Sequence, residues 1–173
     1  MCLWFKRFIL EVGVPAEGTV DHFWNEDMHV IEDHPEADYH YGSIDYGTGN
    51  ATCAGLFSMR RVAPILGTRR PPPRVWLKAS YSNGRETGRQ KTDGEYADDL
   101  VVFDRGTGVK YLYLDPSAAS LTAELQQRGF TVLAAHKDVL NGIWRQAQML
   151  RSGEYQVCVE YARDPGVFGV PVG

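Results

Sequence analysis

The order of apolar runs and turn residues predicts three strands in the first half of the chain. Segments 39–45 (YHYGSID) and 51–59 (ATCAGLFSM) flank the turn-rich YGTGN, an arrangement typical of a β-hairpin. Residues 69–74 (RRPPPR) contain three consecutive prolines without backbone donors, so they form a loop before a third strand at 74–82 (RVWLKASYS). Residues 1–38 show little periodicity and are expected to be an arm leading into a domain at 39–173.

Helical periodicity begins after this third strand. Thr92 is the expected N-cap of a helix, because Glu95 stands three residues later in the capping-box position. Tyr96, Leu100 and Phe103 recur at helical spacing and are predicted to face the core.

Short apolar runs then alternate with two further helices. The runs at 111–115 (YLYLD) and 130–135 (FTVLAA) are predicted to be strands buried on both faces. Helices are expected at 117–128, started by Pro116 and Ser117 and closed by Gly129, and from an N-cap at Asp138 to Gly153, with a last strand at 155–161 (YQVCVEY).

This order predicts an α/β fold. Three antiparallel strands would continue through βαβ crossovers into a mixed sheet with flanking helices. A chain of 173 residues with 43% apolar residues is long enough for one domain with a buried core. No segment has the roughly 18 apolar residues of a membrane span, and the three cysteines are too scattered for a disulfide framework or a zinc site. We therefore expect a soluble, cytoplasmic protein without a membrane partner.

Charge is distributed unevenly along the chain. The formal net charge is −4, yet residues 60–91 hold nine Lys and Arg against one acidic residue, which is half of all the basic residues. A positive segment on a mildly acidic protein favours contact with a polyanion through one face. The alternative is an ordinary solvated basic loop.

Two aspartates stand at the ends of predicted strands. Asp45 closes the first strand and Asp115 closes the first strand after a crossover, so both are expected at one end of neighbouring strands. Two carboxylates held together favour a hard cation such as Mg²⁺ or Mn²⁺ between them, and a pair of such ions can cleave a phosphodiester. The alternatives are a turn-forming Asp45 and an Asp115 that acts at a helix entrance.

The segments around these aspartates resemble a known family. GSIDYGTGNATCAGLF, then YLYLDPSAASLTAELQQRGF and KDVLNGI, are similar to the nuclease domain of large terminase subunits from tailed phages and prophages, and the similarity covers roughly residues 6–163. The resemblance implies a ribonuclease-H-like fold and a two-metal endonuclease that cuts concatemeric viral DNA during genome packaging. It implies Asp45 and Asp115 as metal ligands. The implied partners are double-stranded DNA, an ATPase domain, the small terminase and the portal.

The chain departs from the family pattern in three places. No GxxxxGK[ST] phosphate loop occurs, so no ATPase domain is expected within these residues. The family's third metal acid, near the C-terminus, is missing from EYARDPGVFGVPVG, which would make the domain truncated there; Asp164 and Glu160 are weak substitutes. Residues 78–80 (KAS) stand where the family often has an acid at the end of the third strand.

Four basic residues are candidates for DNA contact. Arg85, Arg89 and Lys91 lie on the segment between the third strand and the next helix, and Lys137 precedes the helix capped by Asp138. Their contact with phosphates would be independent of base sequence. Two other functions stay open: a catalytically incomplete prophage remnant or DNA-binding packaging module, and another ribonuclease-H-like nuclease such as a resolvase or transposase core.

Overall fold

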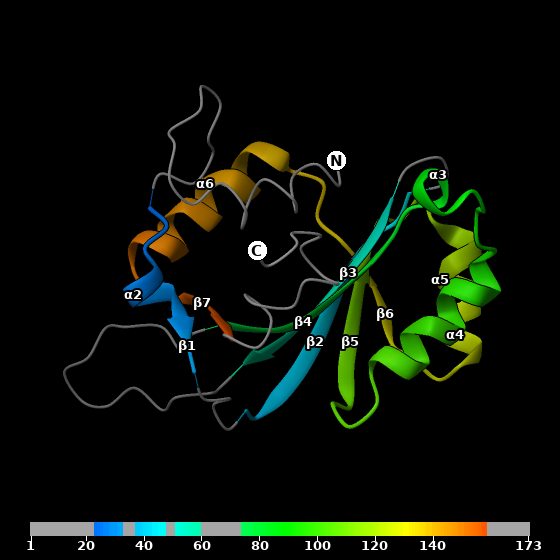
Figure 1. Ribbon diagram of the computed structural model, residues 1–173, viewed down its shortest axis with the longest axis horizontal. Helices are drawn as coiled ribbons and strands as arrows, with labels where there is room; N and C mark the ends of the chain where they lie inside the picture. The colour runs from blue at the N-terminus through cyan, green and yellow to red at the C-terminus, as the bar shows by residue number, and fades with distance from the viewer. Residues whose placement is uncertain (1–22, 33–36, 48–50, 60–73, 159–173) are drawn as a thin grey trace.

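The computed structural model describes residues 23–32, 37–47, 51–59 and 74–158. They form a seven-stranded sheet with the strand order β1-β7-β4-β3-β2-β5-β6, shown in Figure 1. The strands are β1 Val30–Ile31, β2 Tyr39–Asp45, β3 Thr52–Met59, β4 Arg74–Ser82, β5 Val109–Leu114, β6 Val132–Ala134 and β7 Tyr155–Cys158.

The sheet is mixed, as the sequence predicts. β2, β3 and β4 pair antiparallel in succession, and β5 and β6 continue the sheet in parallel beyond β2. β7 pairs in parallel with β4 at the other edge, and β1 pairs with β7. The three antiparallel strands and the crossovers of the predicted α/β fold are therefore confirmed.

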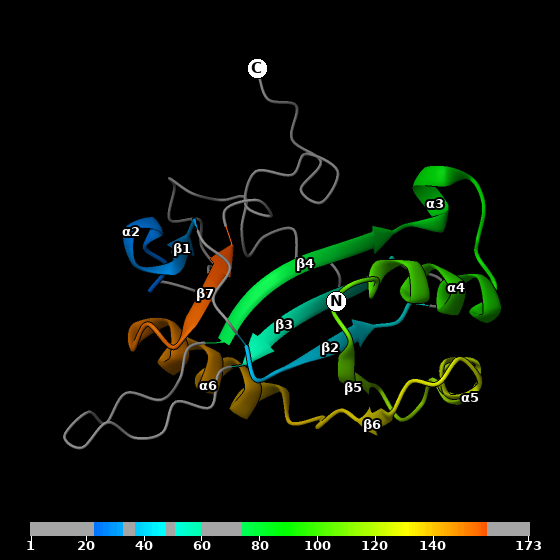
Figure 2. The ribbon, with the colours of Figure 1, turned by 90° about the horizontal axis from the view of Figure 1, so that it is seen from below.

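Five described helices accompany the sheet: α2 Glu26–His29, α3 Gly84–Thr87, α4 Asp93–Phe103, α5 Ala119–Gln127 and α6 Val139–Arg151. In both ribbon views α4 and α5 lie side by side near β5 and β6, whereas α2 and α6 lie near β1 and β7 (Figures 1 and 2). Among the described helices, none has the length and apolar content needed to cross a membrane.

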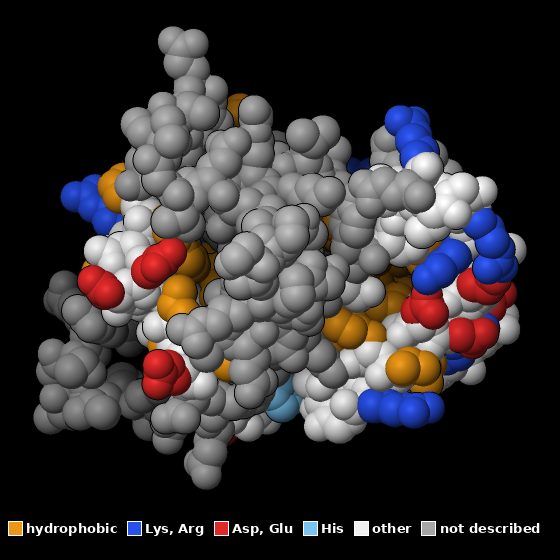
Figure 3. Space-filling model, viewed as in Figure 1, with side chains coloured by type: hydrophobic (Ala, Val, Ile, Leu, Met, Phe, Trp, Pro, Cys, Tyr) orange, Lys and Arg blue, Asp and Glu red, His pale blue; other side chains and the backbone are white. Residues whose placement is uncertain are grey.

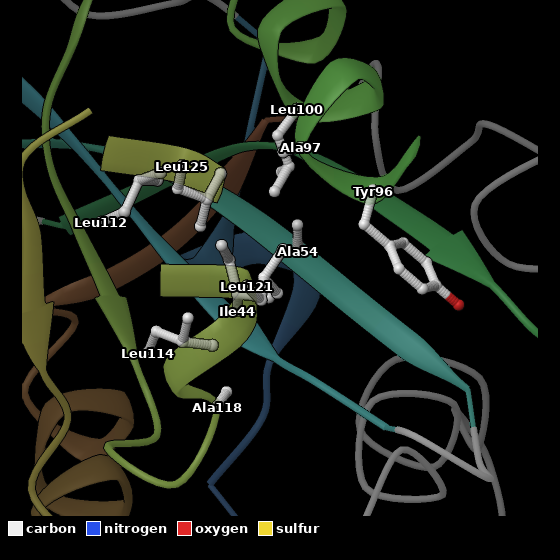
Figure 4. Packing of buried hydrophobic residues seen from close by; sticks show 10 residues of the cluster. All are labelled: Ile44, Ala54, Tyr96, Ala97, Leu100, Leu112, Leu114, Ala118, Leu121 and Leu125. Atoms are coloured by element: carbon white, nitrogen blue, oxygen red, sulfur yellow. The ribbon is translucent and has the colours of Figure 1, made fainter. Parts of the chain in front are cut away.

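One buried cluster joins α4 and α5 to the sheet. Leu121 and Leu125 of α5 are fully buried, and Leu112 and Leu114 of β5 are almost fully buried. They pack with Ile44 of β2 and with residues of α4 in one core. Figure 4 shows these side chains directed into the space between the two helices and the sheet. This face of the sheet is therefore closed by hydrophobic packing.

Of the two strands predicted to be buried on both faces, β5 is buried on one face only, and β6 is exposed at both Leu133 and Ala134. In β5 the buried Leu112 and Leu114 alternate with half-buried Tyr111 and with Tyr113, which is 37% exposed. β6 is the edge strand, and its Leu133 is also 37% exposed. The prediction was wrong because an apolar run does not distinguish a central strand covered by two layers from a strand covered by one.

Local helix signals were more accurate than helix boundaries. Thr92 and Glu95 form the predicted capping box at the start of α4. The helix expected at 117–128 begins instead at Ala119, because Asp115 accepts hydrogen bonds from Ser117 and from the Ala118 backbone and so holds residues 115–118 in a turn.

The glycine that closes α5 has a backbone conformation that disfavours other residues. Gly129 has φ of +91°, and a Cβ added there would meet no atom within 4 Å. Gly129→Ala is therefore expected to lower the free energy of unfolding by about 1 kcal/mol through backbone strain alone. Urea denaturation followed by circular dichroism measures this change.

Gly142 in α6 provides the matched control. It is also surrounded by open space, but its φ is not in the positive range. Gly142→Ala should raise the free energy of unfolding by about 0.5 to 1 kcal/mol, because alanine has the higher helix propensity. Equal effects of the two substitutions would contradict the assignment of strain to Gly129.

The small unit formed by α2 and β1 was not expected within the N-terminal arm. His29, at the end of α2, is fully buried, its Nε2 atom lies 2.8 Å from the Leu150 carbonyl oxygen in α6, and its ring stacks on Trp24. These contacts tie α2 to α6 beside β7. They give a structural role to one of the histidines in the N-terminal quarter of the chain.

Candidate functional site

The sheet brings Asp45 and Asp115 to one edge. β2 and β5 are adjacent parallel strands, and Ile44 is paired with Leu114 in their register. Asp45 is the last residue of β2 and Asp115 directly follows β5, so the two acids stand at the same level on neighbouring strands. The structure thus places both at the carboxyl ends of parallel strands, where open α/β sheets bind ligands.

Both acids are directed away from the core below α4 and α5. Ile44 and Leu114 point into that core, and consecutive strand residues point to opposite faces. Asp45 is therefore directed to the opposite face, and continuing the alternation of β5 places Asp115 there too. The Asp45 side chain is exposed, and its carboxylate has no hydrogen-bond partner or ion pair among the residues that the structure describes.

Asp115 is held by three donors, all on its Oδ1 atom. The Ser117 Oγ donates at 2.6 Å and the Ser117 backbone N–H at 2.7 Å, and the Lys137 Nζ lies 3.0 Å away. The hydroxyl of Ser117, then its N–H, then Lys137 lower the pKa of Asp115 to about 2, because each favours the charged carboxylate. Asp115 is therefore ionised at neutral pH, and its Oδ2 atom is left without a hydrogen bond within the described ranges.

Tyr46 connects this edge to α4, a contact that the sequence did not predict. Its hydroxyl donates to Asp93 in the first turn of α4, and its ring packs edge-on against Tyr96 with 5.8 Å between centroids. Burial, and then the hydrogen bond to Asp93, raise the pKa of Tyr46 to about 12, so the phenol stays a neutral donor at physiological pH. The residue after Asp45 is thus anchored to a helix.

Comparison with solved structures identifies this arrangement. The large terminase of a thermophilic bacteriophage, solved in complex with ATP-gamma-S, shares 33% sequence identity with the chain at a TM-score of 0.71, and the match covers 92% of this chain. The chain spans 38% of the length of that terminase. The P22 large terminase nuclease domain matches with a TM-score of 0.61 and 11% identity, over 84% of this chain and 74% of that domain. The described residues have a large-terminase nuclease fold.

A third structure supports the terminase nuclease fold. The large terminase nuclease from the thermophilic phage G20c, solved with bound cobalt, matches with a TM-score of 0.51 and 18% identity, over 83% of this chain and 76% of that one. No model of a known protein family matches the sequence, and no curated protein is significantly similar to it. The ribonuclease-H-like fold class predicted from the sequence is confirmed.

The segment that carries Arg85, Arg89 and Lys91 begins at the same edge of the terminase nuclease fold as Asp45. Ser82, at the end of β4, is paired with Thr52 at the start of β3, and the next residue of β3, Cys53, is paired with Asp45. α3 follows β4 directly. The segment that contains Arg85 therefore begins beside the edge where the two acids stand.

Of the three predicted basic side chains between β4 and α4, two have acidic partners on α4. Arg89 forms an ion pair with Glu95, and the Lys91 Nζ lies 2.5 Å from Asp99, both acids belonging to α4. Arg85 is exposed and donates only its backbone N–H, to Asn83, among the contacts of the described residues. Figure 3 shows Lys and Arg side chains interleaved with acidic ones on this side of the molecule. Around Arg89 and Lys91 the positive charge is thus balanced by acidic residues of α4.

A complete set of metal ligands is not found within the described part of the terminase nuclease fold. No group of three or more His, Cys, Asp or Glu side chains in that part is arranged to hold a metal ion. Glu160 and Asp164, the predicted substitutes for a third acid, lie outside the described residues. The described part brings together Asp45, Asp115 and Lys137.

Proposed function

We propose that this chain is a metal-dependent DNA endonuclease domain that cuts concatemeric viral DNA during genome packaging. The observation that carries the proposal is the placement of Asp45 and Asp115 at the adjacent carboxyl ends of two parallel strands of a large-terminase nuclease fold. The phage terminases to which the chain is similar support the packaging role. In the intact motor we expect an ATPase domain, the small terminase and the portal as partners, in the cytoplasm of the host cell.

The two aspartates fit a divalent cation by the chemistry of their donor atoms. Asp45 offers an exposed carboxylate and Asp115 an ionised one with Oδ2 free of hydrogen bonds in the described ranges. Carboxylate oxygens are the ligands that Mg²⁺ and Mn²⁺ prefer, and both ions retain waters that complete the coordination. When bound, a pair of such ions supplies an activated water and stabilises the leaving oxygen of a phosphodiester. The cobalt bound to the G20c nuclease supports divalent metal use.

DNA contact is proposed for the basic side chains near this edge. Arg85 is available in α3, and Arg89 and Lys91 would exchange their carboxylate partners on α4 for phosphates. Exchange of exposed ion pairs costs little free energy, because such pairs contribute little to stability. These contacts would position duplex DNA without reading its base sequence.

Cleavage of supercoiled plasmid by the full chain tests the proposed function. With Mn²⁺ the protein should nick and then linearise the plasmid, and a chelator should stop the reaction. Absence of cleavage, together with salt-sensitive DNA binding, would instead identify a catalytically incomplete packaging module. Preferential cleavage of an RNA·DNA hybrid or a four-way junction would identify a different ribonuclease-H-like nuclease.

A further inference from the structure

Lys137 is fixed beside the candidate metal site from two directions. The Ala135 N–H donates to the Leu114 carbonyl at 2.8 Å, which holds the end of β6 beside the end of β5. Asp138 caps α6 by accepting from the Asn141 N–H at 3.1 Å. Lys137 lies between Ala135 and Asp138, so these backbone contacts hold Lys137 at this edge of the sheet.

The ammonium group of Lys137 contacts one of the two Asp115 carboxylate oxygens that a metal ion would bind. Its Nζ lies 3.0 Å from Oδ1 of Asp115, the same oxygen that already accepts two hydrogen bonds from Ser117. With Lys137 in place, Oδ2 is the oxygen left for a cation, and a positive charge stands close to it. The ammonium group and a divalent cation bound at Oδ2 would repel each other, so the ion pair opposes metal binding.

The same ion pair is easily opened. The side chains of Lys137 and Asp115 are 60% and 48% exposed, and exposed pairs of this kind are worth little free energy in water. A lysine released from Asp115 at this edge remains next to the position proposed for the DNA backbone, and its ammonium group binds phosphate as a point charge.

We propose that Lys137 is the resident counter-ion of Asp115: it weakens divalent cation binding in the DNA-free protein, and it moves to a DNA phosphate when the cation and duplex bind. The inference rests on the proposed function and adds to it an order of events at the site. Lys137 is thus a positioning residue whose removal changes metal affinity and DNA affinity in opposite directions.

Metal affinity in the absence of DNA is the decisive measurement. Mn²⁺ is titrated into the full chain, and free Mn²⁺ is followed by electron paramagnetic resonance. Lys137→Met should bind Mn²⁺ about two- to fivefold more tightly than the unmodified protein, the range expected for loss of an exposed ion pair. Lys137→Arg, which keeps the charge, should bind like the unmodified protein.

DNA binding provides the second readout. In Ca²⁺, which takes the same oxygen ligands, Lys137→Met should bind duplex DNA more weakly, with the slope of log K against log salt reduced by roughly 1. Lys110→Met is the matched control, because Lys110 is exposed near the start of β5 and lies over the Tyr111 ring at 5.2 Å. In the Mn²⁺ titration, Lys110→Met should bind Mn²⁺ with the same affinity as the unmodified protein.

The outcomes separate this inference from the proposed function. If the unmodified protein binds Mn²⁺ and Asp115→Asn abolishes binding, but Lys137→Met binds Mn²⁺ equally or more weakly, the role of Lys137 is wrong and the proposed function stands. If the unmodified protein binds no Mn²⁺, both fail. Circular dichroism of each variant confirms that the fold is retained.

Discussion

Asp45→Asn should reduce the Mn²⁺-dependent cleavage rate by about 100-fold or more while leaving the fold intact. The substitution keeps the size of the side chain and removes the charge that a divalent cation requires. Asp45 is exposed and has no partner within the described residues, so its role in stability is small and a loss of activity would not reflect unfolding. The measurement is the initial rate of plasmid nicking at saturating Mn²⁺, with the melting temperature recorded in parallel.

Asp115→Asn should reduce the cleavage rate by a similar factor, again because the carboxylate charge is lost. An asparagine Oδ1 can still accept from Ser117, so the turn before α5 is preserved, but the charge facing the cation is lost. Asp27→Asn, an exposed acid of α2 near the other edge of the sheet, is the control and should cleave like the unmodified protein. Full activity of both Asp45→Asn and Asp115→Asn would refute the assignment of the site.

Features that depend on neighbours in sequence were predictable. The hairpin of β2 and β3, the capping box of α4 and the glycine that closes α5 each depend on residues a few positions apart. The placement of Asp45 and Asp115 was predictable as well, because adjacent parallel strands bring their carboxyl ends to one edge. Topology alone determines that placement, and no side-chain contact is needed for it.

Features that depend on three-dimensional packing were not predictable. The ion pair between Lys137 and Asp115 joins residues 22 positions apart through the pairing of β6 with β5, and the contact between Tyr46 and Asp93 spans 47 positions. No spacing rule covers such pairs. The sequence indicates Lys137 as a candidate for phosphate contact, but only the structure shows its carboxylate partner.

Burial was predicted correctly for the inner face of α4, where Tyr96 and Leu100 are buried, but not for β5 and β6, because an apolar run does not show how many layers cover a strand. Among the apolar side chains of the helices, Leu140 and Trp144 of α6 are 80% and 61% exposed. Leu121 of α5 is fully buried. Truncation of these side chains should therefore change the free energy of unfolding by very different amounts.

Leu121→Ala should lower the free energy of unfolding by about 2 to 5 kcal/mol, the largest stability effect expected in this chain. The side chain fills the space between α5, α4 and the sheet, so its truncation removes buried surface and leaves a cavity. At roughly 2 to 4 °C per kcal/mol for a domain of this size, the melting temperature should fall by about 4 to 20 °C.

Leu140→Ala removes the same atoms from an exposed position and is the matched control, with an expected change within about 0.5 kcal/mol. Chemical denaturation of the two variants gives both values. Because α5 follows the turn that holds Asp115, Leu121→Ala should lose cleavage activity at lower temperatures than the unmodified protein, yet cleave normally where it remains folded. Loss of activity in fully folded Leu121→Ala would show that the core below α5 also sets the geometry of the acidic pair.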